Sequence, residues 1–190
     1  MNNKKELRKL VGFTENDFII LYIAEFIPRK NHKLIFDIIP KLKQQISNLK
    51  IVLAGKGELL DFYKNFCEEK NYQDIVFFTG YTNEINMYCN ISDILLMPSF
   101  QEGLPISMIE AISTGLPVVA SKIRGHVDVI KSEKNGFLCD LNDTMSFISA
   151  IMKLYKNSDL RCMMGKNNQE RAKIYSIDHV LPIVIEHYQI

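Results

Sequence analysis

The chain has 190 residues, of which 47% are apolar and 24% are charged, and its formal net charge is +1. A chain of this length buries roughly 70% of the surface of its unfolded form, so a hydrophobic core needs neither a metal nor disulfides. The near-zero net charge gives no electrostatic reason for a nucleic-acid partner. Composition therefore predicts one globular domain over residues 1–190, without nucleic acid as a ligand.

Cysteine usage and hydropathy point to the cytoplasm. The four cysteines form no C-x-x-C pair and are typical of reduced core thiols: Cys67, Cys89, Cys139 and Cys162. The opening MNNKKELRKL lacks the continuous apolar stretch of a secretory signal. The longest apolar run, residues 18–24, is far shorter than the roughly 20 residues of a membrane-spanning helix.

Short apolar runs predict the strands, because Ile, Val, Leu and Phe occupy both alternating sets of positions and both faces must be covered. In chain order the six runs are FIILYIA (18–24), KIVLAG (50–55), DIVFFTG (74–80), DILLMPS (93–99), PVVAS (117–121) and NGFLCD (135–140). Apolar residues recur with helical spacing within three further segments: 59–70, 145–155 and 177–188.

Strands that alternate with helices imply parallel pairing through crossover connections. The sequence therefore predicts an α/β fold: a doubly wound, Rossmann-like parallel sheet of about six strands with helices on both faces. From about residue 141 the pattern is helical only. We expect two or three helices there, packing against the sheet or reaching toward a partner domain.

A doubly wound sheet binds ligands beyond the carboxyl ends of its strands, so the residues after each run are the candidates for a site. The first run is followed by AEFIPRKNHK, which places Arg29 and Lys30 before a helix that Asn31 could cap. No glycine occurs in residues 13–54, which excludes a dinucleotide site of the G-x-G-x-x-G type. The two cations fit a solvated surface pair and a ligand contact equally well. His32 is more typical of a structural or exposed position than of a catalyst.

The second run ends in GKGE, residues 55–58. Glycines at this spacing allow a tight turn and a close backbone approach. Such a pair by itself indicates only a turn, with Lys56 as a surface cation.

The most informative segment is PSFQEGLPISMIEAISTGLPVVAS, residues 98–121. A loop carries Glu102 and Gly103, and Pro105 stands where a helix would begin. The helix is expected to run to Gly115, because the following proline prevents its continuation. The segment therefore predicts a strand, a loop and a helix start at the ligand-binding edge.

The start of this helix is a candidate phosphate site. The free N–H groups from Gly103 through Ser107, together with the helix dipole, suit an anion. Glu110 lies about one turn into the helix and could accept hydrogen bonds from hydroxyl groups beside that phosphate, while Glu102 could do so on the other side. Each glutamate alone fits a surface charge or a cap. Together they fit a ligand with both phosphates and hydroxyls, such as a nucleotide sugar.

Within this segment, E-G-L-P-x-S-x-x-E-A followed by T-G-L-P-V-V-A-S resembles the signature of the GT4 (group 1) glycosyltransferases. The resemblance runs from about residue 18 to 143 and includes VFFTGY (76–81), SDILLMPS (92–99) and NGFLC (135–139). Those enzymes have the GT-B fold, two Rossmann-like domains with the active site in the cleft between them. The resemblance implies that residues 1–190 are the C-terminal, donor-binding half and that the N-terminal acceptor domain is absent.

The resemblance also implies roles for individual residues. Lys30 and Glu102 would be catalytic: Lys30 neutralises the diphosphate and Glu102 contacts the transferred sugar. Glu110 would bind the ribose, and the loop at Gly80 and Tyr81 would face the base. The full implied donor-binding set is Arg29, Lys30, Gly80, Tyr81, Glu102, Gly103, Leu104, Pro105, Ile106, Ser107 and Glu110.

Two features of the site depart from, or add to, this pattern. Family members commonly carry an arginine five residues before the lysine, where this chain has Glu25, which leaves Arg29 and Arg124 as alternatives for the second cation. No Asp-x-Asp motif occurs in the chain, which agrees with a reaction that needs no metal. In such a reaction, protein cations and a helix N-terminus stabilise the departing diphosphate. The expected donor is a UDP or GDP sugar, with no cofactor.

The predicted function is the donor half of a retaining hexosyltransferase with a polysaccharide or glycolipid acceptor, inactive by itself. Peripheral membrane association of the full enzyme is compatible with this prediction. Two alternatives stay open: a nucleotide-sugar-binding module without turnover, and half of a split enzyme completed by another chain. A different GT-B enzyme, such as an epimerase or a phosphorylase, is disfavoured by the pairing of Glu102 with Glu110.

Overall fold

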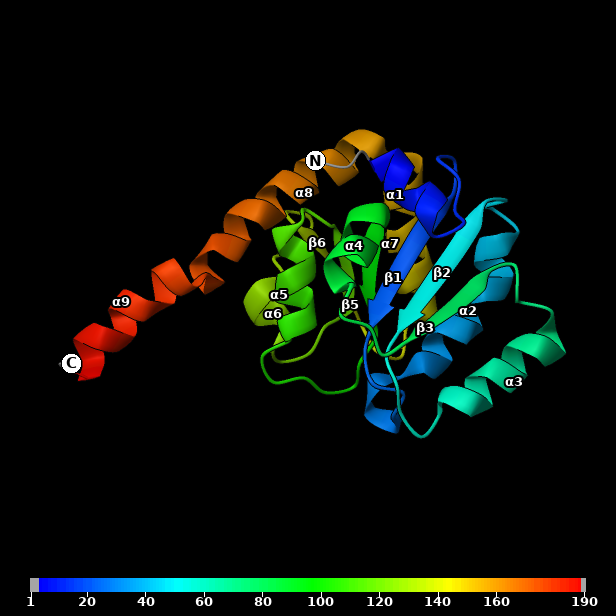
Figure 1. Ribbon diagram of the computed structural model, residues 1–190, viewed down its shortest axis with the longest axis horizontal. Helices are drawn as coiled ribbons and strands as arrows, with labels where there is room; N and C mark the ends of the chain where they lie inside the picture. The colour runs from blue at the N-terminus through cyan, green and yellow to red at the C-terminus, as the bar shows by residue number, and fades with distance from the viewer. Residues whose placement is uncertain (1–3, 189–190) are drawn as a thin grey trace.

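The computed structural model describes residues 4–188, which form a single six-stranded sheet flanked by helices (Figure 1). Every neighbouring pair of strands is parallel, and the spatial order is β3-β2-β1-β4-β5-β6. The strands are β1 (Phe18–Ile23), β2 (Leu49–Ala54), β3 (Val76–Gly80), β4 (Ile94–Met97), β5 (Val118–Ser121) and β6 (Gly136–Cys139). Each lies within a predicted run or begins one residue outside it, and the doubly wound prediction is confirmed.

Helices cover both faces of the sheet (Figure 1). On one face lie α1 (Lys4–Leu10), α4 (Ile85–Ile91) and α5 (Ile106–Ser113); on the other lie α2 (His32–Lys43) and α7 (Thr144–Lys156). The helix α3 (Leu60–Lys70) stacks Tyr63 on Phe36 of α2, with ring centroids 4.7 Å apart. Short helical turns complete the fold: η1 (Pro28–Lys30), α6 (His126–Val129) and η2 (Lys173–Tyr175).

The predicted C-terminal helices are present, and they differ in what they contact. The helix α7 packs against β5 and β6, and α8 (Ser158–Ala172) packs along α5. The last helix, α9 (Ile177–Tyr188), extends away from the body of the domain and buries none of its side chains (Figure 1). Within residues 4–188, no helix combines the length and the apolar character needed to cross a bilayer.

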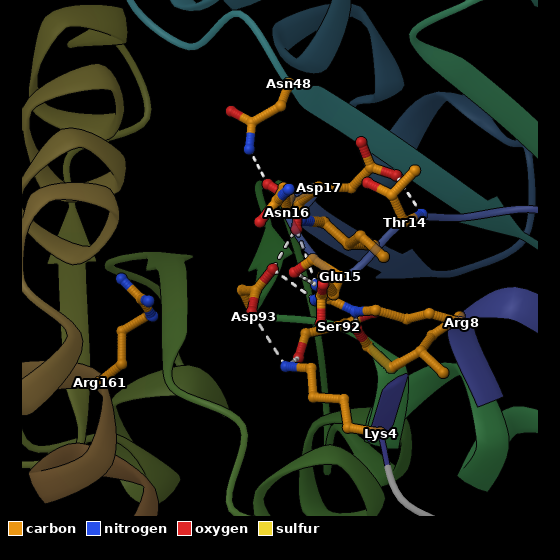
Figure 2. Close-up of polar contacts among 12 residues, drawn as sticks. Lys4, Arg8, Thr14, Glu15, Asn16, Asp17, Asn48, Ser92, Asp93 and Arg161 are labelled. Atoms are coloured by element: carbon orange, nitrogen blue, oxygen red, sulfur yellow. Dashed lines mark hydrogen bonds and ion pairs between the residues drawn. The ribbon is translucent and has the colours of Figure 1, made fainter. Parts of the chain in front are cut away.

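The N-terminal helix is held by a buried arginine that the sequence did not single out (Figure 2). The guanidinium of Arg8 donates to Asp93 at 2.8 Å and to the carbonyls of Ile91, Glu15 and Asp17 at 2.8, 3.0 and 2.9 Å. The Asp93 carboxylate also accepts from the backbone N–H of Ile19 and from Lys4. This cluster joins α1 to the amino ends of β1 and β4, as Figure 2 shows.

Two local predictions need correction, for Asn31 and Cys162, and one, for Gly115, is confirmed. Asn31 stands before α2 but makes no capping bond; its left-handed backbone (φ 53°) turns the side-chain amide toward the carbonyl of Pro98, 3.0 Å away. The helix after Pro105, α5, ends at Ser113, and Gly115 terminates it as predicted: its backbone is left-handed (φ 86°) and its N–H donates to the carbonyl of Ile112 at 3.0 Å. Cys162, predicted as a core thiol, is exposed on α8, whereas the other three cysteines are buried.

The strand order places a switch point between β1 and β4. The chain leaves β1 toward β2 and β3 on one side, whereas β4, β5 and β6 follow on the other. The loops that leave β1 and β4 therefore diverge and open a crevice at the carboxyl edge of the sheet, where such folds bind ligands. Both predicted site loops begin there.

Candidate functional site

A cavity of about 820 Å³ lies at this carboxyl edge. It is lined by the ends of β1 and β2, the turn after β3, and the loop and first turn of α5. Nine of the predicted donor-binding residues line it: Arg29, Lys30, Tyr81, Glu102, Leu104, Pro105, Ile106, Ser107 and Glu110. The structure therefore brings together predicted residues from three separate segments of the chain, and the end of β2 adds a fourth segment to the lining.

Two predicted residues lie outside this lining. Gly80 ends β3 and does not face the cavity, although Tyr81 beside it does. Gly103 lines a neighbouring cavity of about 570 Å³, which also contacts Glu102 and Arg124. The loop at residues 102–104 thus separates two hollows, and Arg124 faces the second one.

Lys30 and Glu102 form the central contact of the site. Nζ of Lys30 donates to Oε1 of Glu102 at 2.6 Å, and the two side chains are 12% and 7% exposed. The guanidinium of Arg29 lies 3.9 Å from the other carboxylate oxygen but is about half exposed. Of the two predicted cations, Lys30 is therefore a buried partner of the carboxylate, and Arg29 is a solvated residue at its edge.

The predicted phosphate loop has fewer free backbone N–H groups than the sequence indicated. Proline has no N–H group, and the N–H of Ile106 already donates to the carbonyl of Leu104 at 3.0 Å. Within residues 4–188, the N–H groups of Gly103, Leu104 and Ser107 make no backbone hydrogen bond. Three donors at the start of an eight-residue helix thus remain for an anion.

A glycine allows a second loop to approach this one. Gly125 has φ 87°, and a Cβ atom there would lie 2.2 Å from the carbonyl oxygen of Gly103. No larger residue fits this contact without moving the backbone. The turn that starts α6 is consequently packed directly against the 102–104 loop.

Two exposed side chains form the rim of the larger cavity on the side of β2 and β3. Nζ of Lys56 lies 5.3 Å from the ring centroid of Tyr81, a cation–π distance. Both residues line the cavity, as does the exposed Glu110. Lys56, predicted as a surface cation, is exposed but belongs to the site.

Sequence reasoning missed several residues of the lining. Gly55 follows β2, and a Cβ atom there would lie 1.9 Å from the carbonyl oxygen of Ala24, so this turn must be glycine to pack beside the β1 loop. The G-K-G spacing was the available signal for that approach. The turn after Tyr81 adds Thr82, Asn83 and Ile85, for which the sequence carries no comparable signal.

His32 is a structural residue, in agreement with its prediction. It is 2% exposed and stacks on Phe26 with ring centroids 4.1 Å apart. Burial, with a smaller contribution from the Lys30 charge, lowers the pKa of His32 from 6.5 to about 3. The ring is therefore neutral at pH 7 and carries no charge toward the cavity.

The part of the chain that the structure describes places no three His, Cys, Asp or Glu side chains together as ligands for a metal ion. The cavity instead presents three cations (Arg29, Lys30 and Lys56), three carboxylates (Glu25, Glu102 and Glu110) and a short row of backbone N–H groups. This set suits an anionic ligand that also carries hydroxyls.

The fold and the cavity define a Rossmann-like ligand-binding domain of the GT-B type. Residues 3–171 match the family model described as "Glycosyl transferases group 1". The chain belongs to this glycosyltransferase family.

Relatives with assigned names support the same assignment. The chain is 32% identical over 169 residues to the UDP-Gal:alpha-D-GlcNAc-diphosphoundecaprenol alpha-1,3-galactosyltransferase of Escherichia coli, covering 87% of this chain and 43% of that enzyme. It aligns with TarM of Staphylococcus aureus, solved with UDP, at a TM-score of 0.81 and 26% identity, covering 90% of this chain and 35% of TarM. Anabaena HepE, solved with UDP, has a TM-score of 0.88 at 20% identity, which shows the shared fold; the match covers 98% of this chain and 52% of HepE.

The chain spans about half the length of the curated relatives it matches, 43% and 45% in two examples. It corresponds to their C-terminal part.

Proposed function

We propose that this chain is the donor-binding domain of a retaining hexosyltransferase that uses a nucleoside-diphosphate sugar and a polysaccharide or glycolipid acceptor. One observation carries the proposal: the cavity at the switch point joins Lys30, Glu102 and Glu110 to the start of α5. A UDP sugar is the first choice of donor, since the Escherichia coli relative is named for UDP-Gal and both structural neighbours were solved with UDP. A GDP sugar is the second, because a mycobacterial relative is named as GDP-mannose-dependent.

The diphosphate is proposed to lie between Lys30 and the start of α5. An ammonium group has three N–H donors, so Lys30 can keep its bond to Glu102 and direct the others at phosphate oxygens. The N–H groups of Gly103, Leu104 and Ser107 provide uncharged donors on the other side. As the glycosidic bond breaks, negative charge grows on the diphosphate, and these fixed donors stabilise it without rearrangement.

The carboxylates are proposed to bind hydroxyl groups. Glu102, held by Lys30, faces the transferred sugar, and Glu110 accepts from the ribose one helical turn away. Tyr81 at the rim contacts the base. Arg29 is the proposed second cation, because it lines the same cavity as Lys30 whereas Arg124 lines the neighbouring one.

Transfer is proposed to need an acceptor domain outside these 190 residues and no metal cofactor. The relatives are about twice as long as this chain, and α9 leaves large apolar side chains exposed that include Ile177, Leu181 and Tyr188. The full enzyme would act in the cytoplasm, with peripheral attachment to the membrane where its acceptor is a glycolipid.

Calorimetric titration of the chain with UDP, GDP, ADP and their sugar conjugates tests this proposal. We expect a nucleoside diphosphate to bind in the presence of a chelator, and added magnesium to leave the affinity unchanged. No sugar transfer is expected from the chain alone. Binding that disappears with the chelator, or the absence of binding by all three diphosphates, would contradict the proposed site.

A further inference from the structure

A buried tyrosine contacts the backbone of the residue that carries the paired cation. Tyr22, in β1, is 1% exposed, and its hydroxyl donates to the backbone carbonyl of Lys30 at 2.6 Å. The same oxygen lies 3.1 Å from Oγ of Ser99, which follows β4 and is fully buried. One side chain of the central strand thus joins the two loops that supply the Lys30–Glu102 pair.

The donors in this cluster follow from counting protons. A carbonyl only accepts, so the one hydroxyl proton of Tyr22 goes to Lys30, and the Ser99 hydroxyl must donate to Tyr22. Burial raises the pKa of the Tyr22 phenol, which keeps this proton in place at neutral pH.

The same count extends the cluster to α6. The Ser121 hydroxyl donates to the carbonyl of Ser99 at 2.6 Å. Nδ1–H of His126 donates to the Ser121 carbonyl at 2.9 Å, and the same nitrogen lies 3.2 Å from the Ser121 hydroxyl oxygen. Ser99 thus contacts both neighbours, Ser121 through its backbone carbonyl and Tyr22 through its hydroxyl, which links α6 to the Tyr22–Lys30 contact.

Two further bonds hold the same pair of loops together. The N–H of Phe100 donates to the carbonyl of Arg29 at 2.8 Å, and the amide of Asn31 donates to the carbonyl of Pro98 at 3.0 Å. The loop that carries Lys30 is thus attached to the loop that precedes Glu102 on both sides of the Tyr22 contact.

We propose that Tyr22 is a positioning residue for Lys30: its hydroxyl holds the Lys30 backbone so that the ammonium faces both Glu102 and the bound diphosphate. The inference rests on the proposed function and deepens it, because it names a residue outside the cavity lining on which phosphate affinity depends. A preorganised donor binds more tightly than one that must be ordered on binding.

The test is a double-mutant cycle on the 190-residue chain with UDP and uridine as calorimetric probes. Tyr22→Phe keeps the ring and removes only the hydroxyl. It should weaken UDP binding about tenfold, because a buried carbonyl loses its partner and Lys30 is released, and leave uridine binding unchanged. In the Lys30→Ala background the same change should have no further effect on UDP. Tyr72→Phe, a buried tyrosine before the amino end of β3, is the matched control and should behave as the parent.

Hydrogen exchange of the ligand-free chain tests the contact independently of binding. Tyr22→Phe should speed exchange of the Asn31 and Phe100 amides, which bond the carbonyls of Pro28 and Arg29, and Tyr72→Phe should not. Unchanged exchange, an equal loss of UDP and uridine affinity, or an undiminished effect in the Lys30→Ala background would overturn the positioning role. If the parent chain binds GDP or ADP instead of UDP, that diphosphate and its nucleoside replace UDP and uridine in the cycle. If it binds none of the three, the proposed function is wrong, and the exchange rates still decide whether Tyr22 holds this loop.

Discussion

Replacing Arg8 by methionine should remove about 3 kcal/mol from the free energy of unfolding without changing the ligand site. The guanidinium makes four hydrogen bonds and its residue is 4% exposed (Figure 2). Removal of one partner of a buried ion pair typically costs about 3–5 kcal/mol, since the other charge is left uncompensated. The lower end applies here because Asp93 keeps its bonds to Lys4 and to the N–H of Ile19.

Urea unfolding followed by circular dichroism measures this loss, and thermal unfolding should show a fall in Tm of about 6–12 °C for a domain of this size. Arg8→Lys keeps the charge but not the forked set of donors, so an intermediate loss is expected. Lys9→Met, at the exposed neighbouring position, is the matched control and should stay within about 0.5 kcal/mol of the parent.

The affinity for UDP of folded Arg8→Met should equal that of the parent, because the cluster lies at the amino ends of the strands and the cavity at their carboxyl ends. A loss of stability below about 1 kcal/mol, or one no larger than that of Lys9→Met, would show that the buried pair is not a net source of stability. Weaker UDP binding by the folded variant would refute the conclusion that the Arg8 cluster does not affect the cavity at the opposite edge of the sheet.

Three further predictions concern the site, the pH dependence and the last helix. Lys30→Ala should weaken UDP binding about tenfold to hundredfold and spare uridine, because charge-assisted bonds to phosphate are lost. Glu110→Gln should lower the affinities for UDP and for uridine alike, since both ligands carry the ribose. If calorimetry shows the same change in the two affinities for Lys30→Ala and Glu110→Gln, the assigned roles are contradicted. The pKa of His32 falls from 6.5 to about 3 on folding, so as the pH is lowered the unfolded chain takes up this proton before the folded chain does. The free energy of unfolding should therefore fall by about 2 kcal/mol between pH 8 and pH 5. Urea titrations at several pH values should show a smaller fall in the free energy of unfolding for His32→Phe than for the parent. The same pH dependence in both would refute the conclusion that His32 is buried in its neutral form. Leu181→Ala, on exposed α9, should leave Tm within about 1 °C of the parent, while the matched change at fully buried Leu154 should cost about 2–5 kcal/mol; a similar fall for both would show that α9 is packed.

The order of apolar runs was sufficient to predict the parallel sheet and the edge at which the candidate cavity lies. Runs such as 18–24 and 93–99 are apolar on both alternating faces and short, which is typical of a parallel strand covered on both faces. Once strands and helices alternate, the loops after all the parallel strands lie at one edge, so the segments of Lys30 and Glu102 were both predicted there. That β1 lies beside β4 is shown only by the structure. The bond between Lys30 and Glu102 at 2.6 Å across 72 positions of sequence is a consequence of topology rather than of local pattern.

Local chemistry was less reliable where a side chain has two possible partners. Asn31 has the composition and position of a helix cap, yet its amide reaches Pro98, because a left-handed backbone turns it away from α2. Likewise, the row of N–H groups at residues 103–107 lost Ile106 to a bond with Leu104, which depends on the path of the loop and not on residue type.

The sequence by itself determined the fold class, the family and the two loops that form the cavity, because these depend on periodicity and on short motifs along the chain. Only the tertiary structure decided which buried polar groups support those loops. In the sequence, Tyr22 is indistinguishable from the apolar residues of its strand, and Arg8 from the other cations of a short charged helix. Their partners Ser99 and Asp93 lie 77 and 85 positions away, respectively. A buried hydroxyl or guanidinium must find its hydrogen-bond partners wherever the packed elements present them, and no local pattern records that choice.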